Sequence, residues 1–350
     1  MISHKLKQNR SAEIFRTDIL SVPTERKFFG KMIDSFKPEG ELYFTAENQA
    51  ALSSVSALER AMQGGRAVEG LVTLCDSNLR LHVDLKCAHG ILEPEEAVLC
   101  RTGETRKDIA IVSRVGKPVT VRITSIEKQG NRVVAHLSRR LAQLDCQKFY
   151  LSRLRPGDLV QARVTHLESF GAFLDIGCGM TSLLSVDSIS VSRISHPRNR
   201  LSVGDLITVA IKSNDPESGR IYVTLRELLG TWQENADRFA VGQTVAGIIR
   251  SVEHYGAFIE LTPNLAGLSE VRSEEHAASL QQMVGKSASV YIKSIIPERM
   301  KIKLVIIDAE NCAPVPKKLS YFIDPSTTSH ISHWVYSPLN ASKQIETRFD

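Results

Sequence analysis

A seven-residue stretch that occurs twice constrains this chain more than any other feature. Ser169–Asp175 reads SFGAFLD, and a close copy, HYGAFIE, occupies His254–Glu260. In each copy two aromatic residues stand three positions apart around Gly-Ala, which predicts a strand in which the glycine forms a bulge. Side chains alternate between the faces of a regular strand, so such a bulge would bring both rings to one face. Two exposed rings would form a stacking platform for single-stranded bases, whereas the alternative is an aromatic pair in a barrel core.

The residues around both stretches reveal a longer repeat. A Gly-x-x-Val block precedes each aromatic pair, at Gly157–Val160 and Gly242–Val245. A Val-Gly-x block and an alternating strand follow each pair, at Val203–Lys212 and Val284–Lys293. A weaker third copy lies upstream, at Gly65–Thr124. A repeat of this kind predicts one small all-β unit that is used three times.

These blocks resemble the RNA-binding domain of the bacterial small-subunit ribosomal protein S-one, here called the S-one domain. The resemblance covers roughly residues 65–308 and is specific in the second and third units but degenerate in the first. It implies a mainly β chain of tandem five-stranded OB-type barrels joined by short helices, with an α-helical N-terminal extension. The chain is therefore similar to a short form of this ribosomal protein family.

The repeat and its joins predict five segments along the chain. They are an N-terminal helical extension at 1–63, a degenerate S-one barrel at 64–142, two S-one barrels at 154–229 and 240–308, and a C-terminal extension at 309–350.

Helices are expected in the extension and in the joins. In the extension we expect them at Glu25–Phe36 and at Ala46–Gln63, the second capped by Thr45. The joins at 139–153 and 226–241 should each form a short linking helix, and the second is similar to the Trp-bearing helix between tandem S-one domains.

The resemblance also implies RNA contacts in the second unit. The RNA face of the S-one family carries two aromatic residues, a His, an Asp and an Arg. The aromatic residues correspond to Phe170 and Phe173, and the Asp and Arg to Asp215 and Arg220. The His position holds Ser185, which departs from the family pattern and removes one expected base contact.

Three arginines in the same unit predict further contacts with phosphates. Arg193, Arg198 and Arg200 stand in a connection that has no acidic residue between Asp187 and Asp205. Arginine binds phosphates and stacks on bases, so these uncompensated cations favour RNA binding. The alternative is a solvated loop.

The third unit keeps part of the same pattern. Tyr255 and Phe258 form its aromatic pair, and Lys301 holds the position of the Arg. The His and Asp positions read Glu270 and Ile296, and an acidic side chain would repel phosphate. We therefore expect the third unit to bind RNA more weakly than the second, or in cooperation with it.

The first unit keeps the frame and loses the aromatic pair. Asp76–Leu81 replaces it with one extra residue, so we expect no ring that could stack. Arg132 keeps a cation at the position of Arg220. The sequence favours a structural or protein-facing role for this unit, with a phosphate contact as the alternative.

Other sequence features exclude several classes of protein. Six scattered cysteines without a Cys-x-x-Cys pair argue against a zinc site and for a reducing cytoplasm. No apolar run predicts a signal peptide or a membrane span. No catalytic motif appears, so we expect no catalytic residue, cofactor, metal or small-molecule substrate. The pair His330 and His333 is expected to pack locally or to make a surface contact.

The sequence thus predicts a cytoplasmic, non-enzymatic protein that binds single-stranded RNA. By resemblance it would hold mRNA at the small ribosomal subunit during translation initiation, by base stacking and phosphate contacts. Two alternatives stay open: an RNA-binding regulator of a ribonuclease or RNA polymerase, and OB modules that dock proteins without binding RNA. The formal net charge of only +5 gives the second alternative some weight.

Overall fold

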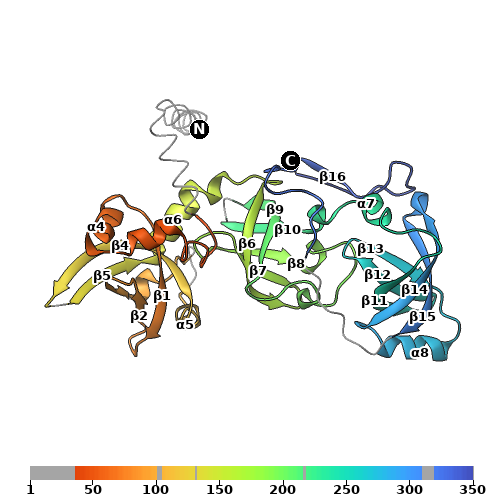
Figure 1. Cartoon of the computed structure of the whole chain (residues 1–350), viewed down its shortest axis with the longest axis horizontal. Coiled ribbons are helices and arrows are strands. Elements are labelled where there is room, and N and C mark those ends of the chain that lie inside the picture. Colours follow the sequence, from red (N-terminus) through yellow and green to blue (C-terminus); the bar gives the residue numbers. More distant parts are fainter. Residues whose placement is uncertain (1–35, 101–104, 131, 216–217, 310–318, 350) are drawn as a thin grey trace, which may run out of the picture. The chain divides into compact units, whose positions relative to one another are not determined.

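The computed structural model describes residues 36–100, 105–130, 132–215, 218–309 and 319–349 (Figure 1). These residues form three closed five-stranded barrels and a C-terminal segment. They fall into two compact units. The first unit ends at Arg153 and also takes in Gly177–Met180, and the second comprises the remaining residues from Leu154 onward.

The first barrel has the strand order β1-β2-β3-β5-β4. It closes because β1 pairs with β4 and β3 pairs in parallel with β5, while all other pairs are antiparallel. Leu81 and Val83 of β2 alternate with less buried residues along their strand. Together with Val119 and Val121 of β4, they fill the core of this barrel. Its elements are β1 (Val68–Cys75), β2 (Leu81–Asp84), β3 (His89–Leu92), η1 (Pro94–Glu96), α5 (Asp108–Val112), β4 (Pro118–Gln129) and β5 (Arg132–Ser138).

The second and third barrels repeat this topology, again with a parallel pair between the third and fifth strands. The second consists of β6 (Leu159–Glu168), β7 (Gly171–Asp175), β8 (Thr181–Ser185), η3 (Val186–Ser188), η4 (Pro197–Asn199), β9 (Leu206–Asp215) and β10 (Arg220–Thr224). The third consists of β11 (Thr244–Glu253), β12 (Gly256–Thr262), β13 (Leu265–Ser269), α8 (Glu274–Gln282), β14 (Ser287–Ile296), η6 (Pro297–Arg299) and β15 (Lys301–Ala309). The predicted fold class, tandem five-stranded barrels, is therefore confirmed.

Short helices join the barrels, as the sequence predicts. The first join contains α6 (Arg139–Phe149) and η2 (Leu151–Arg153), and the second contains η5 (Arg226–Leu229) and α7 (Trp232–Ala236). The hydroxyl of Thr231 accepts a hydrogen bond from the backbone amide of Glu234. The carboxylate of Glu234 in turn accepts a hydrogen bond from the backbone amide of Thr231. This capping box fixes the start of α7.

The N-terminal extension differs from the prediction in one respect. The single helix expected at 46–63 is two helices, α3 (Ala46–Ala51) and α4 (Val55–Gln63). Thr45 caps α3 as expected, but Ser54 accepts the amide of Ala57 and starts a second helix. A serine side chain competes with the helical backbone for such bonds, which accounts for the break. The helix expected at 25–36 lies outside the described residues, apart from Phe36.

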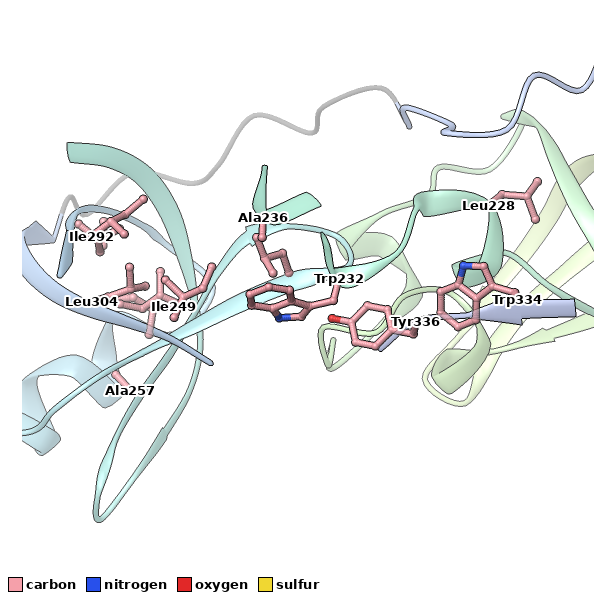
Figure 2. Packing of buried hydrophobic residues seen from close by; sticks show 14 of the residues in the cluster. Leu228, Trp232, Ala236, Ile249, Ala257, Ile292, Leu304, Trp334 and Tyr336 are labelled. Atoms are coloured by element: carbon pink, nitrogen blue, oxygen red, sulfur yellow. The ribbon is translucent and has the colours of Figure 1, made fainter. Parts of the chain in front are cut away.

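The C-terminal segment carries a small sheet of two strands, β16 (His333–Val335) and β17 (Glu346–Arg348). Trp334, Tyr336 and Phe349 of this segment are buried in the hydrophobic cluster that also contains Trp232 of α7 and the core of the third barrel. Figure 2 shows Trp232, Tyr336 and Trp334 in succession within this cluster. Among the residues that the structure describes, no helix is long and apolar enough to cross a membrane.

Candidate nucleic-acid interface

The aromatic pair of the second barrel lies where β6 turns into β7. Phe170 occupies the turn, and Phe173 lies within β7. Their ring centroids are 5.9 Å apart and their planes meet at 87°. Phe170 is 54% exposed and Phe173 is half-buried. Both rings therefore share one region of the surface, which a ring buried in the core could not do.

The bulge that the sequence predicts exists, but it lies in the partner strand. Pairing between β6 and β7 moves from Val164–Leu174 to His166–Phe173, so Thr165 is the extra residue. By contrast, β7 pairs with β8 without interruption from Gly171 to Asp175. Phe170 escapes strand alternation because it stands in the turn ahead of β7, so the prediction of a bulge at the glycine is wrong.

Gly171 has a different role, since it allows two strands to approach closely. A Cβ atom at this position would lie 2.5 Å from the carbonyl oxygen of Leu184 in β8. Any other residue would push β8 away from the turn that carries Phe170. The glycine of the motif is thus required by strand packing.

The third barrel reproduces this geometry. Its pairing moves from Ile249–Ile259 to Ser251–Phe258, so the extra residue again lies in the first strand of the barrel. The ring centroids of Tyr255 and Phe258 are 6.1 Å apart, with planes at 88°. Tyr255 is 51% exposed. Two equivalent ring pairs are therefore presented by equivalent elements.

His166 is a member of the second platform that sequence reasoning missed. Its ring lies opposite Phe173 with a centroid separation of 6.3 Å and an interplanar angle of 25°. The imidazole is exposed, and its Nε2 lies 2.7 Å from Oε1 of Glu168. The equivalent residue in the third barrel is Ser251. The sequence identifies His166 as the partner of Phe173 only if the bulge is placed in β6, because the bulge sets the register between β6 and β7.

Cations occupy equivalent places at the start of the fifth strand in each barrel. Arg220 is the first residue of β10, Lys301 the first of β15 and Arg132 the first of β5, and all three are exposed. Asp215, which is also exposed, pairs with Arg220 across the hairpin of β9 and β10. Ile296 holds the equivalent place opposite Lys301. The offsets read from the sequence therefore identify the same structural position in each barrel.

The position of the family histidine is filled differently in this chain. Ser185 ends β8 opposite Gly171, and its hydroxyl donates to the Ser188 hydroxyl over 2.9 Å. The ammonium of Lys212 donates to the same Ser188 oxygen over 3.2 Å. A cation is thus held beside Ser185. In the third barrel Glu270 follows β13 and is exposed.

The three arginines of the connection between β8 and β9 separate into two groups. Arg193 and Arg198 are exposed, as a phosphate contact requires. The side chain of Arg200 is buried and forms an ion pair with Glu260 of the third barrel, a carboxylate that also accepts a hydrogen bond from Nε of Arg250 over 2.7 Å. Burial lowers the pKa of Arg200, and Glu260 opposes this shift. The prediction that Arg200 is uncompensated is therefore wrong, and the ion pair with Glu260 argues against the phosphate contact predicted for it.

The first barrel also departs from its prediction, because a ring does stand at the platform position. Pairing in this barrel moves from Val72–Val83 to Leu74–His82, which places His82 where the other barrels have a phenylalanine. The rings of His82 and His89 are 5.0 Å apart, and Nδ1 of His82 lies 2.8 Å from Nε2 of His89. Burial, His82 and Arg132 lower the pKa of His89, which favours its neutral form.

The described residues contain no group of three or more side chains that could hold a metal ion. The two histidines near the C-terminus are engaged separately with carboxylates. Nδ1 of His330 lies 2.8 Å from Oδ1 of Asp158, and Nε2 of His333 lies 2.8 Å from Oε2 of Glu346. His333 therefore makes a contact within the C-terminal segment, whereas His330 contacts Asp158 ahead of β6 in the second barrel.

A protein-family model matches part of the chain. Residues 153–226 match the S1 RNA binding domain, which is the S-one domain of the resemblance described above. The matched range contains the whole of the second barrel, from β6 to β10.

Similar proteins extend the likeness to more of the chain. The small ribosomal subunit protein bS1 of Staphylococcus epidermidis is 29% identical over 222 residues, which covers 61% of this chain and 55% of that protein. The bS1 protein of Leuconostoc lactis is 34% identical over 160 residues, covering 44% of this chain and 37% of that protein. This chain thus spans about half the length of the relatives it matches.

Proposed function

We propose that this chain, in which residues 153–226 are an S1 RNA binding domain, binds single-stranded RNA on its second and third barrels and acts at the small ribosomal subunit. The similarity to bS1 proteins supports the ribosomal assignment. In this proposal the protein is cytoplasmic, is not an enzyme, and holds mRNA during translation initiation.

The observation that carries the proposal is the recurrence of half-exposed ring pairs. Phe170 and Tyr255 are large aromatic side chains that folding leaves about half exposed. Each stands at right angles to a second ring, so each pair offers an aromatic face and an edge. Bases of any sequence stack on such rings, at about 1–3 kcal/mol per base. The ring pairs account for affinity without predicting a preferred sequence.

Phosphate contacts would come from the cations that flank the rings. Arg220 and Lys301 open the fifth strands of the second and third barrels, and Arg193 and Arg198 are exposed on the connection between β8 and β9. Asp215 stands opposite Arg220 and would orient it or accept a base donor. Arg200 is left out of this scheme because its side chain is paired with Glu260. His166, which stacks on Phe173, is added to it as a third ring.

The geometry favours RNA binding over the protein-docking alternative in the second barrel. A docking surface would gain from a continuous apolar patch, whereas this barrel exposes Phe170 together with the cations Arg193, Arg198 and Arg220. The first barrel lacks the aromatic pair and keeps Arg132 beside a histidine pair. We propose that it contributes less to RNA binding than the second barrel, and that a structural or protein-facing role is its main one.

Direct binding to labelled oligonucleotides tests the proposal. The full chain should bind an unstructured single-stranded RNA more tightly than the same sequence in a duplex, because stacked and paired bases are not available to the rings. Fluorescence anisotropy at several salt concentrations measures both affinities. Equal affinity for duplex and single strand would refute base stacking. Co-sedimentation with purified small ribosomal subunits tests the ribosomal part separately.

A further inference from the structure

The C-terminal segment at residues 319–349, called the strap below, contacts the second barrel, the join and the third barrel. The sequence of this segment left its role undecided. Its contacts lie within one compact unit of the structure, so they can be followed directly. They show what the strap holds together.

The strap pairs with the second barrel at the start of β6. The amide of Leu159 donates to the carbonyl of Ser329, and the amide of Ile331 donates to the carbonyl of Gly157, each over 2.9 Å. A Cβ atom at Gly157 would lie 2.1 Å from the Ile331 carbonyl oxygen, so this glycine admits the strap. Three further bonds to this barrel and to η5 join Thr208 to Tyr321, Phe322 to Leu228, and Thr347 to Glu227.

The strap also bonds the join and the third barrel. The amide of Trp232 in α7 donates to the Tyr336 carbonyl over 2.9 Å. The hydroxyl of Tyr336 donates to the carbonyl of Asn264, between β12 and β13, over 2.6 Å. The guanidinium of Arg238 lies 4.3 Å from the ring centre of Phe322, so the strap covers the join.

Apolar packing follows the same path. One cluster contains Ala210 from β9 of the second barrel, Ile249 from the third barrel, Leu228 and Trp232 from the join, and Trp334 and Tyr336 from the strap. The rings of Trp334 and Tyr336 are 5.5 Å apart (Figure 2). A hydrophobic core shared by two barrels resists independent motion of either one, because separation would expose these rings to water.

A second set of contacts joins the barrels without the strap. The buried Glu260 of the third barrel pairs with Arg200 of the second and with Arg250. Asn264, which is fully buried, accepts the amide of Val191 over 3.0 Å and donates to carbonyls of the join. The connection that carries Arg200 is thus part of an interface between barrels.

We propose that the strap and these contacts fix the second and third barrels as one RNA-binding unit, so that strands able to reach both ring pairs bind far more tightly than shorter ones. The inference rests on the proposed RNA binding. Two sites at a fixed separation give the second contact a high effective concentration and avoid the entropic cost of ordering the barrels during binding. Trp334 and Tyr336 are then positioning residues that act on RNA through the barrels.

Variants of the full chain test this proposal. In the double variant Trp334→Ala/Tyr336→Ala the shared core is weakened, and Tyr336→Phe removes only the hydroxyl that reaches Asn264. Leu339→Ala is the matched control, because this strap residue is 98% exposed. Trypsin should cleave the double variant after Arg238 at least ten times faster than the parent or the control. A melting curve confirms that the barrels remain folded.

Two oligonucleotides provide the binding readout. One of about 4 nucleotides reaches a single barrel, and one of about 20 can reach both, given that an OB fold covers roughly 4–16 nucleotides. The double variant should bind the long strand at least tenfold more weakly than the parent and the short strand equally well. Tyr336→Phe should show a smaller loss in the same direction.

The possible failures are distinguishable. An unchanged preference for the long strand in the double variant, or unchanged cleavage at Arg238, would overturn the inference while leaving RNA binding intact. An equal loss for both strands would mean that the strap only stabilises each platform. If the parent binds neither strand, the proposed function itself fails.

Discussion

Replacement of Phe170 by alanine separates a binding role of this ring from a structural one. Phe170 is 54% exposed, so truncation removes roughly half of the burial of a phenylalanine side chain. Full burial is worth about 1.5–3 kcal/mol, and the expected loss of unfolding free energy is therefore about 1 kcal/mol. A core phenylalanine would cost about 3–5 kcal/mol.

The effect on RNA binding should be larger than the effect on stability. Loss of one stacked base costs about 1–3 kcal/mol of binding free energy, which raises the dissociation constant by about 5-fold to 150-fold. The salt dependence should stay nearly constant, because a ring displaces no counterion. Anisotropy titrations of a labelled single strand and a thermal melt on the same preparation measure both quantities.

The chain offers a matched control in Phe44. This ring is 83% exposed and, like Phe170, stands at right angles to a neighbouring aromatic ring, Tyr43. Phe44→Ala should leave RNA affinity unchanged. The stacking argument would be refuted if Phe170→Ala bound RNA like the parent, or if Phe44→Ala lost as much affinity.

Three further substitutions test the electrostatic contacts. Arg220→Ala should lower the slope of log affinity against log salt by about 0.7, the value for one phosphate contact on a single strand, and an unchanged slope in salt titrations would remove Arg220 from the interface. Glu260→Gln leaves Arg200 and Arg250 without their buried carboxylate and should cost about 3–5 kcal/mol in denaturant titrations. Burial raises the pKa of Glu69 in β1 from its ordinary 4.5 to about 7, so the folded state favours the neutral carboxyl group. The resulting contribution to the free energy of unfolding is fully present below pH 4.5 and is lost as pH rises through 7. Glu69→Gln should remove up to about 3 kcal/mol of that pH dependence, and parallel stability profiles for parent and variant would contradict the assignment.

The sequence predicts what local patterns determine. The Gly-x-x-Val and Val-Gly-x blocks mark β-strand starts and turns, so the number of barrels and the linking helices follow from the repeat. The ring pairs are also local, since Phe170 and Phe173 lie in one turn and strand. Their exposure did not follow from the sequence, because it depends on how the turn between β6 and β7 projects from the barrel.

The sequence fails where a partner from a distant segment decides the outcome. The motif predicts a bulge at Gly171 because glycine often marks one, whereas the pairing of β6 with β7 places the bulge at Thr165. Arg200 looked uncompensated because its carboxylate, Glu260, lies 60 residues away in another barrel. The ring of His82 cannot be predicted from the sequence for the same reason as the bulge. Only the register of β1 with β2 shows that His82 takes the phenylalanine position.

The three barrels share a backbone device and differ in the side chains placed on it. In each barrel the first strand carries one extra residue opposite the second strand. The first residue pair after this register shift is Leu74 with His82 in the first barrel, His166 with Phe173 in the second, and Ser251 with Phe258 in the third. This backbone geometry recurs in all three barrels while the rings change. We therefore infer that the geometry is a property of the barrel fold, whereas the rings determine what each barrel can bind. The second barrel adds His166 to its ring pair, the third has a serine there, and the first has replaced phenylalanine by a histidine that is bonded to its neighbour. Stacking capacity therefore falls from the second barrel to the third and then to the first. The strap contacts the two barrels with the greater capacity, which under our proposal are the two for which a fixed separation increases affinity.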